Sequence, residues 1–121
     1  MAIETNAPRR RPACKLAFHV ERRPQVLRVA IGGEASFDQA EVISAQLLRI
    51  PLGAYSLVVL DLAGLTFLSA LAMGALVAYR RGLWRRGVEL RLANVQAQVW
   101  LALELAGLWN LFQPMDLEQQ T

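Results

Sequence analysis

The chain has 121 residues, of which 55% are hydrophobic and 19% charged, and its formal net charge is +3. This length fits one domain, and the composition excludes a wholly disordered chain because enough apolar surface is present to offset the ordering entropy. The single cysteine, Cys14, excludes an intramolecular disulfide. Because no leading apolar segment has the pattern of a secretory signal, we expect a cytoplasmic location in a bacterial-type cell.

The N-terminal residues 1–12 contain three arginines and one glutamate and so supply +2 of the formal net charge of +3. Three arginines lie between Pro8 and Pro12, and the segment has little apolar periodicity. We predict a disordered, solvated basic tail here, with contact to anionic lipid or nucleic acid as the alternative. The remaining chain is close to neutral, so nucleic acid is not the expected partner.

Alternating apolar residues predict two strands, over residues 16–20 and 26–31, joined by a turn. A helix is expected next, with the Ser36 hydroxyl capping a free backbone amide and Gln39 reaching back to the Ser36 amide. Its apolar face contains Phe37, Ala40, Ile43 and Leu47, and Pro51 and Gly53 end it.

Residues 62–79 contain no charged residue, and the run resembles a membrane span. A span needs about 20 mainly apolar residues, whereas Asp61 closes this run on one side and glycine and hydroxyl residues interrupt it. We therefore predict a buried strand over residues 56–60, a turn, and a helix that Ser69 caps and that continues to about Arg86. Asp61 is interpreted as a strand-end residue hydrogen-bonded to the turn, not as an acid catalyst.

Residues 88–92 alternate and predict a further strand, after which Asn94 is expected to cap a third helix. The buried stripe of that helix contains Val95, Val99, Ala102, Leu103 and Ala106, before a cap at Gly107. The order of these elements predicts an α/β domain with a four- to five-stranded mixed sheet, residues 56–60 in its middle, and helices mainly on one face.

Residues that carry catalysis or bind metals are scarce. His19 and Cys14 are five positions apart, which puts them on opposite faces of a strand, and one cysteine with one histidine cannot build a structural zinc site. Lys15, the only lysine, does not follow a glycine-rich phosphate-binding loop. The sequence therefore indicates no enzyme, no metal and no cofactor.

Residues 57–68, LVVLDLAGLTFL, resemble the central strand and following turn of the STAS (sulfate transporter and anti-sigma factor antagonist) family. Residues 103–112 resemble the last helix and closing turn of the family, and residues 33–36 fall where its first helix begins. We predict a STAS-like domain over residues 13–115 and a polar tail over residues 116–121. The resemblance implies a bacterial, cytoplasmic protein-interaction domain in signalling and transcription regulation.

The sequence departs from the family signature Asp-Ser-x-Gly-Leu at the head of the second helix. An ungapped alignment places Ser69, Ala70, Leu71, Ala72 and Met73 at those five positions. The resemblance implies that the hydroxyl phosphorylated by a partner kinase in this family is missing at Ala70, which leaves Ser69 as a weak substitute. A second family aspartate, at the start of the first helix, is replaced by Ser36.

Both changes remove a charge, so the resemblance implies a neutral, apolar partner-binding edge. The predicted interface residues are Ser36, Phe37, Ser69, Ala70, Leu71, Ala72, Met73 and Ala75. Helical spacing turns Met73, Leu76 and Val77 towards the sheet and leaves Leu71, Ala75 and Ala78 on another side. Cover of this strip by the N-terminal tail or by Trp84 is the alternative.

The expected partner is a protein: an anti-sigma factor, a larger signalling assembly, or a second copy of the chain in a homo-oligomer. The alternative is an accessory subunit of a membrane lipid or anion transport system, which the basic tail favours. A third possibility is a small anion at the N-terminus of the second helix, where free amides attract negative charge. The cluster Arg80, Arg81, Arg85 and Arg86 is interpreted as solvated, with an acidic partner as the alternative.

Overall fold

The structure is a computed structural model that describes residues 16–112. The predictions for the basic tail, for Cys14 and for the polar tail lie outside the described residues. The strands are β2 (Leu16–Arg23), β3 (Val26–Ala35), β4 (Leu57–Asp61), β5 (Leu65–Leu68) and β6 (Glu89–Ala93). The helices are the 3-10 turn η3 (Phe37–Gln39), α1 (Ala40–Leu48), α2 (Ala70–Arg85), α3 (Ala97–Leu105) and α4 (Trp109–Phe112).

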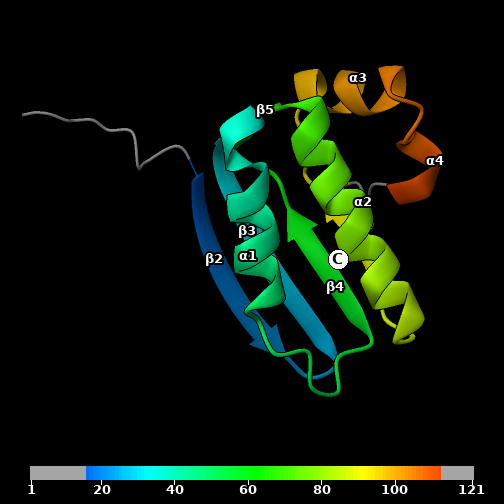
Figure 1. The fold of residues 1–121 in the computed structure, drawn as a ribbon. Coiled ribbons are helices and arrows are strands. Elements are labelled where there is room, and N and C mark those ends of the chain that lie inside the picture. The colour runs from blue at the N-terminus through cyan, green and yellow to red at the C-terminus, as the bar shows by residue number, and fades with distance from the viewer. Residues whose placement is uncertain (1–15, 113–121) are drawn as a thin grey trace, which may run out of the picture.

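The five strands form one mixed sheet, so the predicted α/β class and sheet are confirmed. The strand order is β2-β3-β4-β6, in which β2 and β3 are antiparallel and the other pairs are parallel. Strand β4 is central, and its Val58 and Leu60 side chains are fully buried. Helices α1 and α2 lie side by side on one face of the sheet, and α3 lies at one end (Figure 1).

Strand β5 was not predicted, because its four residues read as part of the turn before the second helix. Strand β3 is ten residues long and pairs with β4 only as far as Ala30. Its last three residues, Gly33, Glu34 and Ala35, pair with β5, and the register shifts between Gly33 and Glu34. The φ of 109° at Gly33 suits glycine. The extra strand brings residues 65–68 to the end of the fold where α1 and α2 begin.

Two helix starts differ from the prediction. The Ser36 hydroxyl caps no backbone amide and instead donates to the Asp38 carboxylate at 2.7 Å, so the expected capping box is wrong. Asn94 does not cap α3 either, because α3 begins after Gln96. Asn94 adopts a left-handed conformation (φ 57°), which asparagine tolerates, and donates through Nδ2 to Asp61 at 3.1 Å.

Asp61 organises the turn after β4, which confirms its predicted structural role. Its carboxylate accepts hydrogen bonds from the Ala63 amide at 3.0 Å, from Asn94, and from the Arg28 guanidinium at 2.9 Å. Burial alone would raise the pKa of the Asp61 carboxyl. The three hydrogen bonds and the charge of Arg28 together lower the pKa by more than burial raises it, so the pKa lies below its ordinary value. The negative charge therefore stabilises the turn that leads into β5.

The uncharged run over residues 62–79 forms a turn, the unpredicted strand β5 and the first part of α2. The prediction that this run is not one continuous membrane-spanning helix is confirmed. Over residues 16–112, no helix combines the length and the apolar character that crossing a bilayer requires.

Candidate functional site: the apolar end of the fold

The first turn of α2 is fixed by Ser69. Its Oγ accepts a hydrogen bond from the Ala72 amide at 3.2 Å, which confirms the predicted N-cap. Its own amide donates to the Ala35 carbonyl at 2.8 Å, so the end of β3 holds the start of α2. Ser69 is only 5% exposed, so its hydroxyl holds the first turn of α2 in place and is not part of the surface.

Replacing Ser69 with alanine (Ser69→Ala) is expected to lower the free energy of unfolding by about 1 kcal/mol, because the Ala72 amide loses its acceptor. Urea denaturation measures this loss. The matched control is Ser44→Ala within α1, where alanine is the better helix former and no loss is expected. Equal stability of Ser69→Ala and the unsubstituted protein would contradict the capping role.

The eight predicted interface residues divide by burial. Phe37 (69%), Leu71 (56%) and Ala70 are exposed, whereas Ser36 and Ala75 are half-buried. Ser69, Ala72 and Met73 are buried, so their predicted place on the interface is corrected: they face the core beneath it. The helical spacing had already assigned Met73 to the sheet side and Leu71 to the other side, and both assignments are confirmed.

The sequence missed two exposed apolar residues at the same end, Phe67 of β5 and Leu101 of α3. Phe67 pairs with Glu34 in the sheet, and the Gln98 side chain joins α3 to β5 by donating to the Thr66 carbonyl at 3.2 Å. Phe67 could not be found because β5 was not predicted. The exposure of Leu101 could have been predicted from the sequence. It lies two positions from both Val99 and Leu103, which places it on the opposite face of α3 from these buried residues.

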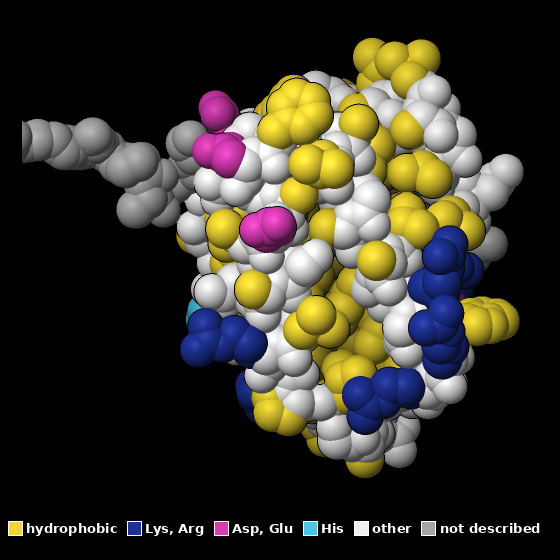
Figure 2. Space-filling view, viewed as in Figure 1, with side chains coloured by type: hydrophobic (Ala, Val, Ile, Leu, Met, Phe, Trp, Pro, Cys, Tyr) yellow, Lys and Arg dark blue, Asp and Glu magenta, His cyan; other side chains and the backbone are white. Residues whose placement is uncertain are grey.

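We call Phe37, Phe67, Leu71 and Leu101 the apolar end. Trp84 does not cover it, because Trp84 lies near the opposite end of α2 and is itself exposed. Figure 2 shows acidic side chains beside apolar ones where α1 begins. Glu34, Asp38 and Glu41 are exposed there, so the edge expected to be neutral is apolar on its α2 side and acidic on its α1 side.

The arginines gather at the other end of α2, where Arg81, Arg85 and Arg86 are exposed (Figure 2).

His19 is exposed on β2. Among the residues that the structure describes, no three histidine, cysteine, aspartate or glutamate side chains gather in a way that could hold a metal ion.

The strand order and the two helices on one face of the sheet place the chain among small α/β domains with a mixed sheet. The profile of the STAS domain matches residues 17–120, and the chain belongs to that family. No curated protein matches the sequence.

Several solved structures share this fold. The anti-sigma factor antagonist SpoIIAA in its unphosphorylated form has a TM-score of 0.68 at 22% identity, over 83% of this chain and 87% of SpoIIAA. An anti-sigma factor antagonist from Mycobacterium paratuberculosis has a TM-score of 0.71 at 20% identity, over 80% and 82%. The murine solute carrier 26 family member A9 anion transporter has a TM-score of 0.67 at 19% identity, over 74% of this chain but only 15% of the transporter.

Proposed function

We propose that this chain is a cytoplasmic, non-catalytic STAS module of the anti-sigma factor antagonist type, which binds a protein partner through the apolar end and is not controlled by phosphorylation there. The observation that carries the proposal is the exposure of Phe37 in η3 and of Leu71 in the capped first turn of α2, two elements that contact each other. Exposed apolar side chains that gather on one surface are typical of binding sites. The acidic residues on the α1 side suit a partner whose contact surface includes basic side chains.

Two residues support the proposed absence of a phosphorylation switch. Ala70 has no hydroxyl at the position where the family carries its phosphoacceptor, and the Ser69 hydroxyl is buried and accepts the Ala72 amide. A kinase would have to open the first turn of α2 to reach Ser69. Intact-mass and peptide mass spectrometry of the protein from cells are expected to show no stoichiometric phosphate at Ser69; a stoichiometric phosphate there would contradict the proposal.

A second candidate function is an accessory STAS subunit of a membrane lipid or anion transport system. The likeness to a region of the murine anion transporter supports it, because that region is a small part of a much larger transport protein. The basic residues 9–11 also favour a position near an anionic membrane surface.

Affinity capture from separated cytosolic and membrane fractions, followed by mass spectrometry, distinguishes the two candidates. Capture of an anti-sigma factor from the cytosolic fraction supports the first, and capture of a transport ATPase or permease from the membrane fraction supports the second. In either case the bound protein must be lost from a Leu71→Glu bait. Retention by that bait would show that the apolar end is not the binding site.

A further inference from the structure

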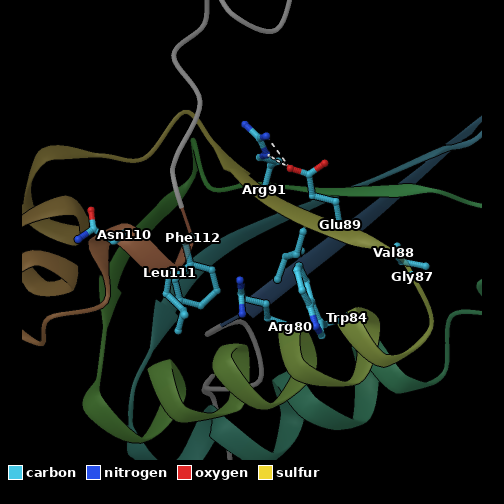
Figure 3. Close-up of a pocket in the computed structure, with 10 residues that line it drawn as sticks. Arg80, Trp84, Gly87, Val88, Glu89, Arg91, Asn110, Leu111 and Phe112 are labelled. Atoms are coloured by element: carbon cyan, nitrogen blue, oxygen red, sulfur yellow. Dashed lines mark hydrogen bonds and ion pairs between the residues drawn. The ribbon is translucent and has the colours of Figure 1, made fainter.

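A pocket separate from the apolar end lies between the C-terminal half of α2, strand β6 and helix α4. Its volume of about 470 Å³ falls within the range of small-ligand pockets, about 300–1,000 Å³. Figure 3 shows Arg80 and Trp84 rising from α2 towards β6, with Leu111 and Phe112 on the α4 side. Arg80 and Trp84 lie nine and thirteen residues beyond Leu71 on α2, which separates them from Leu71 by about 14 Å and about 20 Å along the helix axis.

The walls of this pocket are mainly apolar. Leu90 and Phe112 are buried residues that also belong to the domain core, and the exposed ring of Trp84 forms one side. Val88 and Leu111 complete the apolar lining. An aliphatic or aromatic ligand body would therefore remove apolar surface from water on several sides at once.

The charges at the pocket select one kind of ligand. The Arg80 guanidinium lies over the Trp84 ring, 5.6 Å from its centroid, and within residues 16–112 it forms no hydrogen bond or ion pair. Arg91, the other cation of the lining, is paired with Glu89 through Nε at 2.6 Å. Among the residues that line the pocket, one positive charge is thus left without a counter-charge, which matches a singly charged anion.

We propose that this pocket binds small amphiphilic monocarboxylates, with the apolar body against Leu90, Trp84 and Phe112 and the carboxylate on Arg80. The cation–π contact with Trp84 restricts the planar guanidinium, so less side-chain entropy is lost when it forms two parallel hydrogen bonds to a carboxylate. The ligand site is independent of the proposed protein-binding site at the other end of α2.

Titration of the full chain with octanoate, followed by two-dimensional NMR of backbone amides and tryptophan indoles, tests the proposal. Saturable shifts confined to β6, α4 and the C-terminal half of α2 are expected, with octanol binding at least about 10-fold more weakly. The Arg80→Gln variant is expected to bind octanoate at least about 10-fold more weakly and to lose the preference over octanol, whereas Arg80→Lys should retain part of that preference.

Arg81→Gln is the matched control, because Arg81 is an exposed neighbour on α2 that does not line the pocket. Its octanoate affinity is expected to stay within about 2-fold of the unsubstituted protein. No saturable shift, shifts elsewhere in the domain, or unchanged affinity in Arg80→Gln would each overturn the proposal. Trp84→Ala removes one wall of the pocket and the aromatic partner of Arg80, so it is expected to weaken octanoate binding. Because this side chain is exposed, the free energy of unfolding should change little, and misfolding would not explain the loss.

A membrane surface is the competing occupant of this arginine-rich end. Co-sedimentation with phosphatidylglycerol vesicles that depends on Arg81, Arg85 and Arg86, in a protein that shows no octanoate shifts, would assign this end to anionic lipid and overturn the proposal. Octanoate binding without vesicle binding supports it.

Discussion

Replacing Leu71 with glutamate (Leu71→Glu) is expected to weaken partner binding by at least about 100-fold, while the free energy of unfolding changes by no more than about 0.5 kcal/mol. The side chain is 56% exposed, so a carboxylate at this position stays hydrated in the free protein. In a complex the same carboxylate would be buried, and burying a charge without a counter-charge costs several kcal/mol. Isothermal titration with the captured partner and urea denaturation measure the two quantities.

Leu48→Glu is the control for that experiment. Leu48 is a leucine of α1 that is 75% exposed, and it lies at the end of the helix remote from the apolar end. Its substitution should leave binding unchanged. A Leu71→Arg variant separates desolvation from charge complementarity, because burial penalises either sign of charge whereas attraction to the partner favours one sign.

Two outcomes would contradict this account. Unfolding of the isolated Leu71→Glu protein would show that Leu71 belongs to the core. Equal loss of binding in Leu71→Glu and Leu48→Glu would show that the effect is one of overall charge and not of a local interface.

The sequence alone was sufficient to predict the strands and helices whose apolar patterns are set by burial. The apolar run that became β4 lies between β3 and β6 and is buried over residues 58–60, and such a strand shows few polar residues. Helix α2 could be bounded because Ser69 satisfies a free amide at one end and Gly87, with a φ of 76°, follows the other. Each of these signals depends on neighbours in the chain.

The missed features depend instead on residues far apart in the chain. Strand β5 forms because β3 is longer than β4, which no local pattern in residues 65–68 reveals. The Asn94 side chain could either cap the start of α3 or bond to a distant residue. It donates to the carboxylate of Asp61, which is 33 residues away in the chain, and does not cap the helix. For the site, helical spacing predicted that Leu71 faces away from the core. It could not predict that Phe67 and Leu101, on other elements, lie at the same end of the fold.

Replacing Asp61 with alanine (Asp61→Ala) is expected to lower the free energy of unfolding by about 2–3 kcal/mol at neutral pH. Three donors, the Ala63 amide, the Asn94 side chain and the Arg28 guanidinium, would lose the carboxylate that accepts them. Hydrogen bonds to charged groups contribute about 1.5–3 kcal/mol each, but partial access of water to both Asp61 and Arg28 offsets much of that sum.

The same network predicts how stability varies with pH. Because the pKa of Asp61 is lowered in the folded state, the unfolded chain takes up the proton first as the pH falls, and protonation favours unfolding. The stabilisation by the carboxylate is therefore complete at neutral pH and is lost as the pH falls from about 5 through the folded-state pKa. Asp61→Asn keeps the shape of the side chain and has no proton to bind, so its stability lacks this part of the acid dependence.

Urea denaturation at several pH values compares the unsubstituted protein with Asp61→Asn. The difference in unfolding free energy between them is expected to be largest near neutral pH and to shrink steadily as the carboxylate becomes protonated. A difference that stays constant from neutral to strongly acidic pH would show that Asp61 acts through shape and neutral hydrogen bonding alone. A difference that shrinks would identify its charge as the source, and would connect the turn before β5, and with it one side of the apolar end, to the ionised state of a single carboxylate.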